Sequence, residues 1–326
     1  MTADERGRTA RRADLLRVED VTSPRGGLVR GTRRPPGWQP PGPPPFPPDE
    51  RSELWPDTDE DLCWLAGDWR LLQRREGHRF SLDDLVTAHF AARTATTTAL
   101  PAAAPATTTT TTTTTADGPG PARILDLGCG IGTVLLLMAW RFPASRVWGI
   151  EAQTVSAALA RRSIAWNGAG ARCAVASGDL RDATLLEEEP PFELVTGTPP
   201  YFPRGTGVES DQIQQGPCRF EHRGGIEDYA AAAARRLIPG APFVACAAGT
   251  QTDRVLAAAA AAGLAVDRLR EVIPRAGKAP LVLLFSMRHR ANAPAMVVEP
   301  PLIVRDTAGR RTDEFVALRA EMGMPP

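Results

Sequence analysis

The sequence contains a single lysine, Lys278, and no apolar run long enough to cross a membrane. Its 38 lysines and arginines are balanced by 38 aspartates and glutamates, so no overall field attracts nucleic acid, and any basic surface must be local. A spanning helix needs ~20 apolar residues, and the N-terminus also lacks the apolar core of a signal peptide. We therefore expect a soluble, intracellular protein of the cytoplasm.

Cysteines in metal-binding or disulfide spacing are lacking too. The chain has an odd number of cysteines and no C-x-x-C pair, its five being Cys63, Cys129, Cys173, Cys218 and Cys246. This scatter argues against a disulfide framework and against a zinc site. We expect a reducing compartment and no metal cofactor.

The N-terminal segment, residues 1–60, lacks any helical or strand period. It is rich in arginine, proline and glycine, and nine arginines against five acids make its first 40 residues basic. Such composition predicts a disordered or polyproline-like arm. The arm is either an RNA-contacting or partner-binding tail or a solvated tail without a role.

Large apolar side chains return after residue 60. Residues 61–93 are predicted to be an N-terminal extension of the catalytic domain, with a helix that begins at Ser81 and has Asp84 at the capping-box position. His89 falls on the apolar face of this helix and is interpreted as a core histidine rather than a catalyst. Residues 94–121, which include nine consecutive threonines, are predicted to be a flexible insertion.

From residue 122 the sequence alternates between strand and helix patterns. The predicted strands are 124–127, 147–150, 173–176, 192–196 and 243–247. The predicted helices are 133–141, 154–166, 226–237 and 252–262. Two late strands, 267–273 and 281–287, are predicted to form an antiparallel hairpin. The alternation predicts an α/β fold with a Rossmann-like, doubly wound, mostly parallel seven-stranded sheet and an antiparallel edge hairpin. We assign it to residues 122–290, followed by a strand and helix extension over 291–326.

The stretch RILDLGCGIG, residues 123–132, reads as a buried strand, a glycine turn and the start of a helix. Glycines let the backbone approach a ligand at a helix N-terminus, so this turn is a candidate cofactor site, although such turns also occur as plain connections. Its G-x-G-x-G spacing differs from the G-x-G-x-x-G of dinucleotide-binding proteins. Asp126, just before the glycines, favours a cationic ligand without phosphate.

Two further acids follow predicted strands at the edge where open α/β sheets bind ligands. Glu151 ends the second strand, where a carboxylate can accept both hydroxyls of a ribose. Asp179 follows the third strand, where an acid can accept an adenine amino proton. Neither acid is specific alone, because a surface carboxylate after a strand is common.

The fourth strand of this domain leads into the sequence Thr198-Pro199-Pro200-Tyr201. A proline pair holds the backbone extended and leaves its carbonyl groups free to accept hydrogen bonds. The ring of Tyr201 could stack on a planar substrate. The alternative is a plain proline turn beside a core tyrosine.

Together these segments resemble class I S-adenosylmethionine-dependent methyltransferases. The stretches RFSLDDLVTAHFA, PPYFPRGTG and RFEHRGGIEDYAAAAARRLIPG are similar to the bacterial tRNA adenine-N6 methyltransferases that modify the adenosine just 3′ of the anticodon of a valine tRNA. The resemblance implies the class I methyltransferase fold, S-adenosylmethionine as cofactor and tRNA as substrate. It assigns cofactor binding to Asp126, Gly128, Cys129, Gly130, Gly132, Glu151 and Asp179, and catalysis to Thr198, Pro199, Pro200 and Tyr201.

In that family an asparagine amide oxygen and the first proline carbonyl accept the two protons of the target amine. This chain departs from the family at that position, because Thr198 replaces the asparagine. The alternatives are therefore a guanine-N2 methyltransferase for ribosomal RNA, a glutamine-N5 methyltransferase for protein, or a scaffold that binds the cofactor without catalysis. A dinucleotide-dependent dehydrogenase is disfavoured by the glycine spacing.

Cationic side chains flank the Pro-Pro-Tyr motif and are candidates for phosphate contacts with RNA. Some of them could instead pair with neighbouring acids of the same segment, and the oligomeric state is left open. The candidate substrate-binding residues are Arg204, Arg219, His222 and Arg223.

Overall fold

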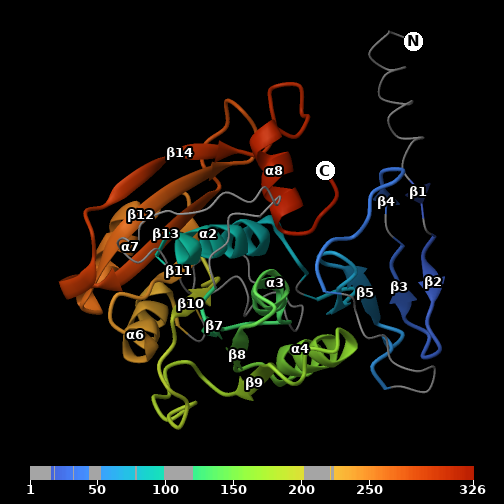
Figure 1. Cartoon of the computed structure of the whole chain (residues 1–326), viewed down its shortest axis with the longest axis horizontal. Coiled ribbons are helices and arrows are strands. Elements are labelled where there is room, and N and C mark those ends of the chain that lie inside the picture. The colour runs from blue at the N-terminus through green and yellow to red at the C-terminus, as the bar shows by residue number, and fades with distance from the viewer. Residues whose placement is uncertain are drawn as a thin grey trace, which may run out of the picture.

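The computed structural model describes residues 16–17, 19–31, 33–43, 53–77, 79–98, 120–201, 221 and 224–326. Three sheets lie within these ranges: a two-stranded pair, a four-stranded sheet and an eight-stranded sheet (Figure 1). The N-terminal elements are β1 (Leu16–Arg17), β2 (Val21–Thr22), β3 (Leu28–Val29), β4 (Arg33–Arg34), β5 (Glu60–Trp64), β6 (Arg70–Arg74) and α2 (Leu82–Thr98).

The remaining elements alternate between strand and helix as the sequence predicts. They are β7 (Arg123–Leu127), α3 (Thr133–Arg141), β8 (Arg146–Glu151), α4 (Thr154–Trp166), β9 (Cys173–Ser177), β10 (Leu194–Gly197), α6 (Ile226–Arg236), β11 (Phe243–Ala248), α7 (Thr252–Ala261), β12 (Leu264–Ile273), β13 (Val282–His289), η1 (Arg290–Asn292), β14 (Val297–Ile303) and α8 (Asp313–Glu321).

The large sheet has the order β14-β12-β13-β11-β10-β7-β8-β9. Strands β11, β10, β7, β8 and β9 are mutually parallel, and β13 pairs antiparallel with both β11 and β12. Helices α2, α3 and α4 belong to the apolar core of one face, whereas α6 and α7 belong to the core of the other face. The α/β doubly wound, mostly parallel architecture is therefore confirmed.

The number of strands and the position of the hairpin differ from the prediction. The sheet has eight strands rather than seven, because β14 pairs in parallel with β12 and places the β12–β13 hairpin one strand inside the edge. β14 contains Pro300 and Pro301, which cannot donate to a ladder and are tolerated on an edge strand. Leu302 on this strand is buried, so the strand covers part of the core.

Residues 21–29 also differ from the expectation of a disordered arm over residues 1–60. Strand β2 pairs with β3, and β3 pairs with β5 to give the order β2-β3-β5-β6. β2 and β3 have only two residues each, too few to show an apolar period, and polar contacts hold this part of the chain. The buried Asp61 carboxylate accepts from Arg30 Nε at 2.9 Å, and Ser23 Oγ donates to the Pro56 carbonyl at 2.7 Å.

The four-stranded sheet is docked on α4 through hydrogen bonds to the backbone of β6. Asn167 accepts from Arg70 N at 2.8 Å and donates to its carbonyl at 2.7 Å, while Ser163 Oγ accepts from Leu72 N at 2.9 Å. The short N-terminal strands consequently lie beside the eight-stranded sheet, to the right in Figure 1, away from β14.

Helix α2 begins as predicted. Ser81 N donates to Asp84 Oδ2 at 2.9 Å, which is one half of the expected capping box. His89 lies on the buried side of α2, where its Nε2 is 2.9 Å from Glu321 Oε2 of α8, in agreement with a core histidine. The helix continues to Thr98, and most of the threonine-rich segment lies outside the described residues. The division of the chain into five segments stays a prediction.

No helix in the described ranges is long and apolar enough to cross a membrane.

Candidate active site

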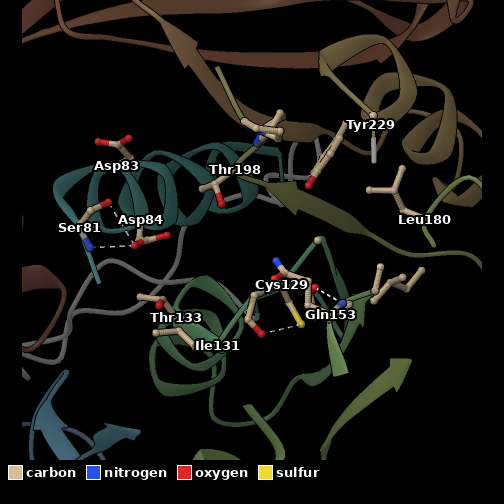
Figure 2. A pocket seen from close by; sticks show the side chains of 18 of the residues that line it. Ser81, Asp83, Asp84, Cys129, Ile131, Thr133, Gln153, Leu180, Thr198 and Tyr229 are labelled. Atoms are coloured by element: carbon tan, nitrogen blue, oxygen red, sulfur yellow. Dashed lines mark hydrogen bonds between the residues drawn. The ribbon is translucent and has the colours of Figure 1, made fainter. Parts of the chain in front are cut away.

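A cavity of about 680 Å³ opens at the carboxyl ends of the parallel strands. Its walls come from the start of α2, the turn between β7 and α3, the end of β8, the segment after β9 and the segment after β10. Figure 2 shows labelled side chains from all five places around one space. Ligand pockets for small molecules are typically of this size, so the cavity can hold a nucleoside-sized cofactor.

The glycines of the β7–α3 turn are required by its backbone geometry. Gly128, Gly130 and Gly132 have φ angles of 58°, 56° and 89°, in the left-handed region that other residues rarely adopt. A Cβ on Gly128 would lie 2.0 Å from the Tyr229 hydroxyl oxygen, whereas one on Gly130 would meet nothing within 4 Å. Gly130 therefore presents bare backbone to the cavity, and Gly132 packs against Ala160 instead of lining it.

The Glu151 side chain is held by two backbone amides, one of them in the glycine turn. Its Oε2 accepts from Gly130 N at 2.9 Å, and its Oε1 accepts from Gln153 N at 2.6 Å. The side chain is 6% exposed and lines the cavity. Each carboxylate oxygen has a second lone pair, so Glu151 can accept ligand hydroxyl protons while it holds the turn in place.

Asp126 lies behind the turn and does not line the cavity. Its carboxylate is 2% exposed and accepts from Thr196 Oγ1 at 2.8 Å and from Leu135 N at 3.1 Å. The pKa of this carboxyl group is raised to about 7, mainly by burial, and the nearby charges of Asp84 and Glu151 act in the same direction. Asp126 thus ties β7 to β10 and to the start of α3. The structure does not bring it to the cavity lining, where a direct contact with the cofactor would require it to be.

Cys129 and Asp179 both line the cavity, with different surroundings. The Cys129 thiol packs over Gly149, and burial raises its pKa well above the usual value, so it is neutral. Asp179 is about one third exposed and binds Arg181 through two oxygens, at 2.9 and 2.6 Å. The carboxylate is therefore accessible but already paired with one guanidinium group.

The Pro-Pro-Tyr segment lies at the opposite wall, directly after β10. Thr198, Pro199, Pro200 and Tyr201 all line the cavity, and Gln251 Nε2 donates to the Tyr201 carbonyl at 3.0 Å. The Tyr201 hydroxyl donates to Asp83 Oδ2 at 2.7 Å. The structure thus brings the four predicted catalytic residues together with the glycine turn.

Sequence reasoning missed the contribution of α2 and α6. Ser81, Asp83 and Asp84 at the start of α2 and Tyr229 of α6 line the cavity (Figure 2). The capping-box pattern gave the start of α2, but no local signal shows that a helix begins at a cavity more than forty residues away in sequence. The predicted substrate-binding residues Arg204, Arg219, His222 and Arg223 lie outside the described residues.

Comparison with known proteins identifies the family. A family model described as "Methyltransferase domain" matches residues 124–203. The chain is also 30% identical over 197 residues to the tRNA1(Val) (adenine(37)-N6)-methyltransferase of Porphyromonas gingivalis, a match that covers 60% of this chain and 76% of that relative. The chain belongs to this methyltransferase family. The methyltransferase uses S-adenosylmethionine as its cofactor.

Other methyltransferases match over shorter stretches or with lower identity. The release factor glutamine methyltransferase of Bordetella pertussis is 32% identical over 122 residues, which cover 37% of this chain and 42% of that relative. Among solved structures, a predicted O-methyltransferase of Agrobacterium tumefaciens superposes with a TM-score of 0.48 at 22% identity, covering 62% of this chain and 90% of that one.

The residues present fit this cofactor. The backbone at Gly130 faces open space, Glu151 offers acceptors, and the described lining of the cavity has four carboxylates against one cationic side chain, Arg79. An acidic, glycine-lined site suits a cationic sulfonium ligand that carries hydroxyl groups. Within the described ranges no group of three or more His, Cys, Asp or Glu side chains could hold a metal ion, and the absence of a metal cofactor stays a prediction.

Proposed function

We propose that this methyltransferase transfers a methyl group to N6 of an adenine in tRNA. The observation that carries the proposal is that Thr198, Pro199 and Tyr201 line the same cavity as the glycine turn and Glu151. A base amine at the Pro-Pro-Tyr wall would therefore face a cofactor at the glycine wall. The family relative named above supports tRNA as the substrate, and location in the cytoplasm, where tRNA is modified, is part of the proposal.

The cofactor-binding wall is assigned residue by residue. Glu151 accepts hydrogen bonds from the ribose hydroxyl groups, Asp179 lies near the adenine, and the backbone from Gly128 to Gly130, with Cys129 between, passes close to the ligand. Asp126 and Gly132 support the turn without lining the cavity. The Asp126 carboxylate accepts from Thr196 of β10, and Gly132 packs against Ala160 of α4. When bound, S-adenosylmethionine supplies an electrophilic methyl group on a positively charged sulfur.

The substrate-binding wall orients the amine. The lone pair of an exocyclic amine is delocalised into the base, so acceptors that take both amine protons help to localise it. We propose that in this chain the Thr198 hydroxyl and the Pro199 carbonyl are those acceptors and that the Tyr201 ring stacks on the base. The cations Arg204, Arg219, His222 and Arg223 are proposed to contact the RNA phosphates.

Glutamine-N5 methylation of a protein is the second candidate. The similarity to a release factor glutamine methyltransferase favours it, because an amide nitrogen is also a delocalised, planar nucleophile. A guanine-N2 enzyme for ribosomal RNA and a catalytically inactive scaffold are further possibilities that the same assay separates.

The test is methyl transfer from labelled S-adenosylmethionine to purified tRNA, ribosomal RNA and a release factor, followed by identification of the methylated nucleoside or residue. Methylated adenine in tRNA is the expected product. Thr198→Asn should then preserve or raise kcat, because the amide restores an acceptor that acts mainly in the transition state. Thr307→Asn is the matched control, since Thr307 is exposed and lies outside the cavity. Loss of tRNA methylation in Thr198→Asn with intact cofactor affinity would contradict the adenine-N6 assignment.

A further inference from the structure

The Tyr201 side chain is held at its hydroxyl by two elements that are distant in the sequence. Its oxygen donates to Asp83 Oδ2 of α2 at 2.7 Å and lies 3.1 Å from Cys246 Sγ of β11. The backbone of the same residue is held by Gln251, which precedes α7. Tyr201 is therefore fixed at both ends, and Asp83 supplies the charged acceptor.

The protonation states support this arrangement. Burial and the neighbouring Cys246 and Asp83 raise the pKa of Tyr201 well above its usual value, so the hydroxyl keeps its proton and can donate. Burial also raises the pKa of Cys246 to about 12, so its thiol is neutral. A phenylalanine in place of Tyr201 would keep the flat ring but would lack the hydroxyl through which Asp83 and Cys246 hold the ring tip.

We propose that Asp83 is a positioning residue for substrate binding that acts through the Tyr201 hydroxyl. The inference rests on the proposed function in one respect, namely that the Tyr201 ring stacks on the substrate. Both residues line the cavity, and a hydrogen bond at the tip of the ring holds the ring in position against the substrate that stacks on it. The segment before the sheet domain thereby contributes to substrate recognition.

The first experiment needs no substrate. The chain has two tyrosines, Tyr201 and Tyr229, so tyrosine-labelled protein gives two sets of NMR ring signals, and Tyr229 serves as an internal reference. In Asp83→Ala the Tyr201 signals should shift and broaden while those of Tyr229 stay in place, and Asp83→Asn should restore most of the wild-type spectrum because its amide oxygen still accepts. Unchanged Tyr201 signals in Asp83→Ala would overturn the proposal whatever the substrate is.

The second experiment measures the coupling between Asp83 and Tyr201 in methyl transfer. Its substrate is the one of tRNA, ribosomal RNA and release factor that the wild-type protein methylates. Asp83→Ala and Tyr201→Phe should each lower kcat/KM by about tenfold, mainly through KM, and the double variant should lose no more than either single variant. Cofactor affinity should not change. Asp253→Ala, which removes an exposed acid from the first turn of α7, is the control and should have no effect.

The outcomes separate the two proposals. If Asp83→Ala lowers kcat/KM by the same factor in the Tyr201→Phe background as in the wild type, Asp83 acts independently of the tyrosine. That result would overturn the positioning role. If the wild type methylates the release factor instead of tRNA, the proposed substrate is wrong, whereas the coupling between Asp83 and Tyr201 is still tested on that protein.

Discussion

The buried carboxyl group of Asp126 predicts a pH-dependent stability that its amide replacement should lack. Asp126 is 2% exposed and accepts hydrogen bonds from the Thr196 hydroxyl and the Leu135 amide. In Asp126→Asn the amide oxygen can accept from one of these groups, and its NH2 can donate to the threonine oxygen. The variant therefore keeps the local contacts and removes only the group that can ionise.

The direction in which stability changes with pH follows from the raised pKa of Asp126. In the folded chain the pKa of Asp126 is about 7 against an ordinary value of 3.8, mainly because of burial. Between these values the unfolded chain has lost a proton that the folded chain keeps, so wild-type stability falls as the pH rises. The shift of about 3 pKa units corresponds to ~4 kcal/mol at 1.36 kcal/mol per unit. Below pH 4 the contribution vanishes, and above pH 7 it is constant.

Urea unfolding of wild type and Asp126→Asn at pH 5, 6, 7 and 8 measures this difference. The variant should be the more stable protein at pH 8, by up to ~4 kcal/mol, with a gap that narrows toward pH 5. Asp253→Asn, at an exposed acid, should run parallel to wild type over the whole range. A gap between wild type and Asp126→Asn that is the same at all four pH values would refute the reasoning.

Two further substitutions test the cofactor wall. Glu151→Ala removes the acceptor of two backbone amides and the proposed acceptor of the ribose hydroxyls. It should weaken S-adenosylmethionine binding by tenfold or more in a calorimetric titration; unchanged affinity would contradict the assignment. Gly128→Ala should destabilise the fold by about 2 kcal/mol or more in urea unfolding, since its Cβ would meet the Tyr229 oxygen at a positive φ. Gly170→Ala, with open space around its Cβ and no positive φ, should be close to neutral.

The meeting of the glycine turn and Glu151 at one cavity could be predicted because its signals are local. An apolar strand, a glycine turn and an apolar helix occupy consecutive residues of the sequence, and Glu151 follows the next strand directly. In the structure, Gly130 N donates to Glu151, a contact between the turn after β7 and the end of the adjacent parallel strand β8. Where strand ends determine the geometry, the order of elements is enough to place the side chains.

The remaining features depend on contacts that no local pattern encodes. Tyr201 hydrogen-bonds to Asp83 across 118 residues of chain. β14 is a strand despite two prolines because it pairs with β12 at the edge of the sheet, where prolines are tolerated. Strands β2 and β3 are too short for a period of two to be visible, and a buried aspartate, Asp61, helps to hold them. In each case a tertiary contact outweighs the local propensity.

The charges that line the cavity determine which part of an RNA can enter it. Its described lining includes four carboxylates, those of Asp83, Asp84, Glu151 and Asp179, and a single cationic side chain, Arg79, which is itself bound to the buried Asp61 at 3.0 Å. Such a cavity attracts a sulfonium ligand and repels phosphates. A base can therefore enter it only if the sugar-phosphate backbone stays outside, so the affinity for RNA must come from cations beyond the cavity. The salt-dependent part of RNA binding and the chemistry then belong to different residues. Removing cavity carboxylates should therefore change methyl transfer without steepening the salt dependence of RNA affinity.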